Sequence, residues 1–154
     1  MQPIRKILHP TDFSKSAEPA LELAINLAHT YSAELTVLHV YAVPIYMGPF
    51  GDGYTLQPEL VQKLKEEADR AMQVFRQRAA QAGVRIQTLT VEGIVSEVIV
   101  AEAEARGMDL VVMGTHGRTG FKHLLLGSVA ERVLRQSPIP ILTVRASTEV
   151  KADL

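Results

Sequence analysis

Residues 110–129 read LVVMGTHGRTGFKHLLLGSV, and this stretch decides the fold. It opens with an apolar run, 110–113, that has the length and composition of a buried strand. The glycines at 114, 117 and 127, with Ser128, give the spacing G-x2-G-x9-G-S before a new helical pattern. Glycine lets backbone N–H groups approach an anion, and a helix start adds partial positive charge. The stretch therefore favours a phosphate-binding turn, although a plain strand-to-helix turn could contain the same glycines.

Strand and helix patterns alternate through the rest of the chain. Strand-like runs occupy 4–9, 35–41, 84–91, 110–113 and 139–144. Helical periodicity follows Ser16, fills 58–82 and 95–106, and begins again at 128. We expect Pro10 to end the first strand, because proline has no N–H for the ladder. The order β-α-β-α-β-α-β-α-β predicts an α/β fold, a parallel sheet covered by helices on both faces.

Composition restricts the class of protein. At 154 residues the chain fits a single domain, which we place at 1–146 with a polar tail at 147–154. The net charge of −1 gives no field that would attract nucleic acid or an anionic membrane. No apolar run approaches the ~18 residues of a transmembrane helix, so we expect a cytoplasmic protein. The absence of cysteine excludes disulfides and thiolate metal sites.

Two of the predicted strand ends carry polar, turn-rich sequence. Pro10-Thr11-Asp12 follows the first strand, and Gly114 to Gly117 follows the fourth. In open α/β sheets, ligands bind at the carboxyl ends of strands where the strand order reverses. If these two strands are neighbours, a carboxylate and a phosphate-binding loop flank one crevice. That combination favours a nucleotide over a bare anion.

Nearly the whole chain resembles the universal stress protein family, specifically its ATP-binding branch. The resemblance rests on Pro10-Thr11-Asp12-Phe13-Ser14, on Leu38-His39-Val40, on the run from Met113 to Arg118, and on the run from Gly127 to Glu131. The family pattern for ATP binding, G-x2-G-x9-G-[S/T], is matched without a gap. Two features depart from it: Val95 stands where many relatives have proline, and the Gly- and Pro-rich loop from Ala42 to Gln57 fits no fixed pattern.

The resemblance implies an open five-stranded parallel sheet of strand order 3-2-1-4-5, an adenine nucleotide alpha hydrolase-like fold. It also implies ATP as ligand, with Mg²⁺ or Mn²⁺, and a homodimer formed through the last strand, Ile139 to Val144. Asp12 and the backbone of Val40 would face the adenine, and the loop glycines with His116 would line the ribose and phosphates. The complete set of implied nucleotide-binding residues is Pro10, Thr11, Asp12, Val40, Met113, Gly114, His116, Gly117, Arg118, Gly127, Ser128 and Val129.

Catalytic signatures are missing from the sequence. There is no G-x-x-x-x-G-K-[ST] loop, no kinase motif set and no pair of metal-binding histidines on a helix. We therefore expect a stress-response or signalling protein that binds ATP with slow or no hydrolysis and acts on an unknown protein partner. The alternatives are a nucleotide-independent interaction module, a slow ATPase or autophosphorylating protein with Ser128 or Thr119 as acceptor, and a preference for AMP or a cyclic nucleotide.

Several of these residues also have an ordinary structural explanation. Asp12 could cap the helix that follows it. His116 could be a solvated loop histidine, and Arg118 and Lys122 could be surface cations. His9 and His39 lie on buried strands, where hydrogen-bonded core histidines are expected.

Overall fold

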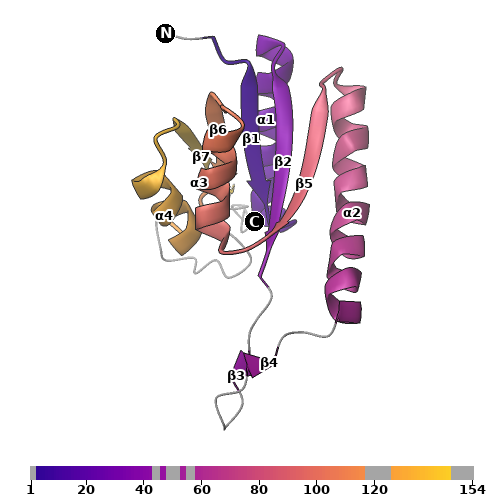
Figure 1. Ribbon diagram of the computed structural model, residues 1–154. Coiled ribbons are helices and arrows are strands. Elements are labelled where there is room, and N and C mark those ends of the chain that lie inside the picture. The colour runs from indigo at the N-terminus through magenta and orange to yellow at the C-terminus, as the bar shows by residue number, and fades with distance from the viewer. Residues whose placement is uncertain (1–2, 43–45, 48–52, 55–57, 117–125, 147–154) are drawn as a thin grey trace, which may run out of the picture.

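The computed structural model describes residues 3–42, 46–47, 53–54, 58–116 and 126–146. Its centre is a parallel sheet in the order β5-β2-β1-β6-β7 (Figure 1). Counted along the chain among the strands of this sheet, the order is the predicted 3-2-1-4-5, so the predicted fold class is confirmed. The sheet strands are β1 (Lys6–Thr11), β2 (Glu34–Tyr41), β5 (Ile86–Glu92), β6 (Leu110–Gly114) and β7 (Ile141–Val144).

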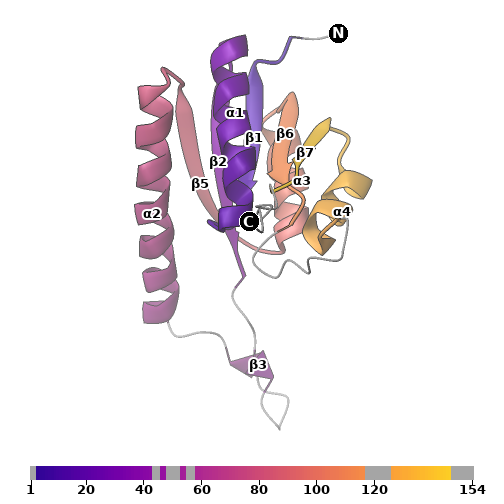
Figure 2. The ribbon, with the colours of Figure 1, turned by 180° about the vertical axis from the view of Figure 1, so that it is seen from behind.

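Helices cover both faces of the sheet (Figures 1 and 2). Side chains from α1 (Glu18–Tyr31) and α2 (Pro58–Gln81) form one core layer with the sheet, around Leu21, Met72 and Phe75. Side chains from α3 (Val95–Ala105) and α4 (Ser128–Gln136) form the other, around Ile99 and Val133. Alternate residues of β1 enter opposite layers, because successive side chains of a strand point to opposite faces.

Proline 10 does not end the first strand, so that expectation was wrong. The strand β1 continues through Pro10 to Thr11 and keeps its pairing with β2 to the end. In a parallel strand, the N–H and C=O of one residue point to one neighbour and those of the next residue to the other. The Arg5 carbonyl accepts the N–H of Glu34 at the start of β2, and the Lys6 carbonyl accepts the N–H of Asp109 just before β6. By this alternation, even-numbered residues of β1 face β6, and so does the backbone nitrogen of Pro10. Pairing with β6 ends at Leu8, and the missing N–H therefore interrupts no bond to β2.

The first long helix begins later than Ser16. A short 3₁₀ turn, η1 (Lys15–Ala17), comes first, and Ala17 is the N-cap of α1. Ser16 instead forms a hydrogen bond with Ser14 through its hydroxyl, at 2.8 Å. Pro19 lies in the first turn of α1, where its missing N–H removes no helical bond.

The segment between β2 and α2 contains more order than the irregular loop that the sequence predicts. Two short strands, β3 (Tyr46–Met47) and β4 (Gly53–Tyr54), pair antiparallel beyond the carboxyl ends of the sheet strands (Figure 1). The predicted tail at 147–154 lies outside the described residues, so the domain boundary at 146 stays a prediction. Among the residues that the structure describes, no helix has the combination of length and apolar character that crossing a bilayer demands.

Replacement of Met72 by alanine should reveal how much the α2 layer contributes to stability. Met72 is fully buried, whereas Val74 on the same helix is 53% exposed. We expect Met72→Ala to lower the free energy of unfolding by about 3 kcal/mol, through lost burial and a residual cavity. Val74→Ala, the matched control, should change it by less than about 0.5 kcal/mol. Urea unfolding measures both, and equal effects would contradict this packing.

Candidate functional site

The carboxyl ends of β1, β2 and β6 lie together at one edge of the sheet. Thr11 is in register with His39 of β2, and Leu8 of β1 is in register with Val111 of β6. The connection after β1 leads to α1 on one face, while the connection after β6 leads to α4 on the other (Figures 1 and 2). The chain thus has a strand-order switch point between β1 and β6, the place where open α/β sheets form their binding crevices.

A hydrogen-bonded turn closes the β1 end of this crevice. The Phe13 N–H donates to Thr11 Oγ1 at 3.1 Å, and the Ser14 N–H donates to Asp12 Oδ1 at 3.0 Å. The Ser14 hydroxyl also donates to Asp12 Oδ1, at 2.5 Å. The Asp12 carboxylate therefore shapes the turn before η1 and is not a cap of α1. It is half-buried at the crevice, where the sequence places it.

Phe13 has a backbone conformation that sequence patterns do not predict. Its φ of 61° lies in the left-handed region, which a bulky side chain rarely adopts. Its ring packs against His39, with centroids 4.4 Å apart, and against Phe75 of α2, at 5.7 Å. His39 Nδ1 in turn donates to the Thr11 carbonyl at 2.9 Å. These contacts fix the turn to β2 and α2, so the position of Asp12 depends on the core beneath it.

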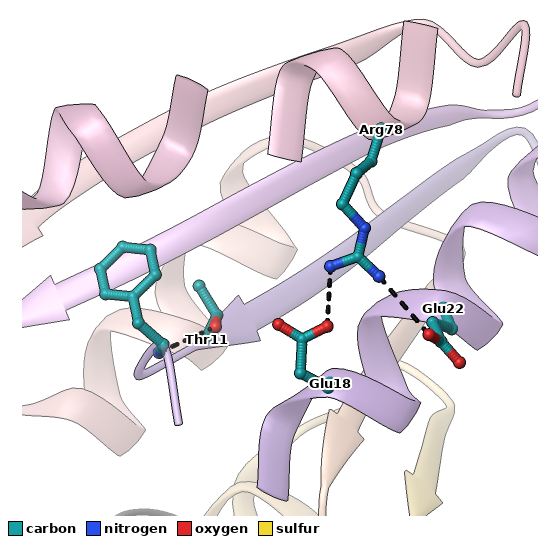
Figure 3. Close-up of polar contacts among 5 residues, drawn as sticks. Thr11, Glu18, Glu22 and Arg78 are labelled. Atoms are coloured by element: carbon teal, nitrogen blue, oxygen red, sulfur yellow. Dashed lines mark hydrogen bonds and ion pairs between the residues drawn. The ribbon is translucent and has the colours of Figure 1, made fainter. Parts of the chain in front are cut away.

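An ion pair beside the turn joins the two helices of this face. Arg78 of α2 reaches Glu18 of α1 at 2.7 Å and Glu22 at 3.6 Å (Figure 3). Figure 3 also shows Thr11 at the end of β1 near this pair, with its hydrogen bond to the following turn. Since all three charged side chains are partly exposed, the ion pair contributes little to stability and mainly restrains the two helices.

At the β6 end of the crevice, backbone segments approach one another closely. A Cβ added to Gly114 would lie 3.4 Å from the Ser16 carbonyl oxygen, so β6 ends against the start of the β1 connection. The Gly127 N–H donates to the Thr115 carbonyl at 2.7 Å. A Cβ at Gly127 would lie only 3.0 Å from that same oxygen. Thr115 and Gly127 therefore lie side by side, and glycine suits the close approach because a larger residue at 127 would crowd the Thr115 carbonyl.

The N-terminus of α4 opens beside this closure. Gly127 is its N-cap, and the first helical hydrogen bond runs from the Glu131 N–H to the Gly127 carbonyl. The N–H groups of Ser128, Val129 and Ala130 come before that bond and so have no acceptor within the helix. Together with the helix dipole, such N–H groups form an anion-binding site. The exposed Ser128 adds a hydroxyl to it.

The other predicted site residues fall at the same edge or outside the described part. Val40 is nearly buried, one residue beyond the pairing of His39 with Thr11. Met113 is buried as the penultimate residue of β6, and half-buried His116 shares a hydrogen bond of 2.9 Å with Thr115 Oγ1. Four loop residues considered from the sequence lie outside the described residues: Gly117, Arg118, Thr119 and Lys122.

His9 lies fully buried directly beneath the crevice. Its Nδ1 is 2.9 Å from the Val112 carbonyl, which can only accept, so Nδ1 carries the proton. Burial lowers the pKa of His9 from 6.5 to about 4, against the opposing effects of that hydrogen bond and of the Glu18 and Asp12 charges. The imidazole is therefore neutral at physiological pH, as a core histidine.

The low pKa of His9 predicts a loss of stability in acid. The unfolded state binds this proton at a higher pH than the folded state does, so stability falls as the pH drops from 6.5 towards 4. Across that window the shift corresponds to about 3 kcal/mol. His9→Leu should remove this part of the pH dependence when unfolding is measured in urea at pH 7 and pH 4.5. An unchanged slope in the variant would contradict the assignment.

A second hollow lies away from this edge, between α3 and α4. It has a volume of about 660 Å³, and Glu97, Glu104 and Gln136 are among its lining residues. Its two carboxylates would repel an anionic ligand, whereas the crevice presents N–H groups and a helix N-terminus. In the described part of the chain, no three His, Asp or Glu side chains gather closely enough to hold a metal ion.

Comparison with known proteins identifies the relatives of this chain. The model of the universal stress protein family matches residues 3–145. Universal stress protein MJ0531 of Methanocaldococcus jannaschii is 40% identical over 92% of this chain and 82% of its own length. A solved structure of protein MJ0577 is 34% identical, with a TM-score of 0.81 over 96% of this chain and 99% of that one.

Two more distant structures contain nucleotides. One is a universal stress protein in complex with cAMP, 24% identical with a TM-score of 0.71 over 95% of this chain and all of that one. The other is the universal stress protein from Archaeoglobus fulgidus in complex with dAMP, 20% identical with a TM-score of 0.62 over 94% of this chain and all of that one. At these identities the likeness shows a common fold alone.

Proposed function

Because the chain belongs to the universal stress protein family, we propose that it binds an adenine nucleotide in the crevice between β1 and β6. We take ATP, carried with Mg²⁺ or Mn²⁺, as the ligand. The observation that carries the proposal is the strand-order switch point itself: Asp12 follows β1, the N-terminus of α4 is hydrogen-bonded to the end of β6, and β1 and β6 are neighbours in the sheet. The cAMP and dAMP complexes of distant relatives support the choice of an adenine nucleotide.

The phosphate end of the ligand fits the N-terminus of α4. The first-turn N–H groups of Ser128 and Val129 would donate to phosphate oxygens, with help from the Ser128 hydroxyl. The close contact between Gly127 and the Thr115 carbonyl supports this placement, because it brings the backbone of α4 to the edge of β6. Gly114, Gly117, His116 and Arg118 are proposed to line the ribose and phosphates on the other side.

The adenine end fits the ends of β1 and β2. The Asp12 carboxylate would accept a hydrogen bond from the base, and the backbone of Val40 would offer further polar atoms at the end of β2. Pro10, Thr11 and Met113 would form the apolar wall, since Thr11 and Met113 are nearly buried there. The turn contacts of Phe13 would hold Asp12 in position before the ligand arrives, which lowers the entropy cost of binding.

The sequence contains residues suited to binding a nucleotide but no signature of a catalytic set. Phosphoryl transfer requires a positioned nucleophile and charge neutralisation at the γ-phosphate. We therefore propose nucleotide binding as a signal in a cytoplasmic stress-response protein, with slow or no hydrolysis. One observation keeps self-phosphorylation as a second candidate: Ser128 is exposed at the phosphate end of the crevice and could accept a phosphoryl group.

The homodimer is proposed to form through β7. This strand lies at the edge of the sheet, so one row of its backbone groups has no partner strand within the sheet. Leu142 of β7 is 37% exposed, which leaves apolar surface beside that edge. A second copy of the chain would cover the unpaired backbone edge and the exposed Leu142. Nucleotide binding would then take place in each subunit of a dimer.

Calorimetric titration with Mg-ATP tests the nucleotide proposal. Asp12→Asn replaces one acceptor oxygen by a donor and should weaken ATP binding by roughly tenfold or more, as for other bonds to a charged group. Asp109→Asn is the matched control. Asp109 lies just before β6, at the opposite end of the same strand pair, and its carboxylate accepts the Arg5 and Lys6 N–H groups.

The control should bind ATP as the wild type does. Absence of heat at millimolar ATP in the wild type would refute nucleotide binding. Equal weakening by the Asp12 and Asp109 substitutions would refute this location for the site.

Sedimentation of two charged variants tests the dimer. Leu142→Asp should give a monomer at micromolar concentration, because a buried charge at the β7 edge would have no partner. Leu134→Asp changes a leucine of similar exposure, 43%, on α4 and should leave the dimer intact. A wild-type monomer, or a dimer that survives Leu142→Asp, would contradict assembly through β7.

A further inference from the structure

The pairing of β1 with β6 has a gap just below the crevice. The register of the two strands ends at Leu8 with Val111. The Val111 N–H donates to Pro140 on the β7 side, so the backbone groups of Val112 face β1. Backbone groups that face β6 recur at every second residue of β1, so Pro10, two residues beyond Leu8, lies opposite the Val112 carbonyl. Proline has no N–H to donate.

A side chain fills this gap. His9 Nδ1 lies 2.9 Å from the same Val112 carbonyl. The imidazole is fully buried, and its Nε2 is a buried polar atom without a hydrogen-bond partner in the described part of the chain. A buried nitrogen without a partner costs free energy, so this histidine needs an explanation. Its Nδ1 bond and the packing around the ring hold the imidazole in place.

We propose that His9 is a positioning residue for the nucleotide site, because its Nδ1–H replaces the ladder bond that Pro10 cannot make to Val112. This inference rests on the proposed function. The bond links β1 to β6 one residue beyond the point where their backbone register ends. Two residues further along, Thr11 and Gly114 already belong to the opposite walls of the crevice. The His9 bond thus sets the distance between the two walls. Because Pro10 has no N–H, regular pairing of β1 with β6 does not continue into the crevice.

A rescue experiment separates this role from simple core packing. His9→Leu removes the donor at similar volume and should weaken Mg-ATP binding about tenfold, the factor expected for one buried hydrogen bond. His9→Gln keeps a side-chain donor for the Val112 carbonyl and should bind Mg-ATP within about threefold of the wild type. Equal weakness in the Leu and Gln variants, with both folded by thermal unfolding, would overturn the proposal.

A spectroscopic measurement tests the bond without any variant or nucleotide. Long-range ¹H–¹⁵N NMR at pH 7 should show His9 as the neutral tautomer with its proton on Nδ1. A proton on Nε2 would overturn the proposal whether or not ATP binds. If the tautomer is as expected but the wild type gives no heat with Mg-ATP, the proposed function fails, and with it the role of His9 in binding.

Discussion

The ladder between β1 and β6 stops at Leu8 and Val111, while the connections that follow the two strands run to opposite faces of the sheet. Neighbouring strands whose connections diverge must leave an opening at their carboxyl ends. Every polar feature of the candidate site lies at this opening. The turn around Asp12 forms one wall, and the end of β6 with the start of α4 forms the other.

Both walls are held by contacts that come from elsewhere in the fold. The turn at Phe13 adopts a conformation that costs free energy, and its packing on His39 and Phe75 offsets that cost. The start of α4 is tied to Thr115 by a backbone hydrogen bond at a close approach that favours glycine at position 127. Such a preformed site would lose little entropy when a ligand binds.

Apolar periodicity and glycine positions are local signals, and they predict the alternating strands, the covering helices and the polar strand ends. The sheet order, by contrast, is implied by the family resemblance. The same local signals predict Asp12 and Gly114 at strand ends and Gly127 at a helix start. The course of β1 through Pro10 was not predicted, because it depends on which neighbour the missing N–H faces. The left-handed Phe13 and the role of His9 were also missed. Each depends on contacts between residues far apart in the chain, such as His9 with Val112, which no local pattern encodes.

Amide NMR during a titration with Mg-ATP tests the central claim most directly, because it locates the bound nucleotide. The account predicts that the largest shift changes fall on Thr11 to Ser14, on Gly114 to His116 and on Gly127 to Ala130. Residues around the acidic hollow between α3 and α4, such as Glu97 and Glu104, should stay unchanged. Changes centred on that hollow, or no changes at millimolar ATP, would contradict nucleotide binding at the β1–β6 crevice.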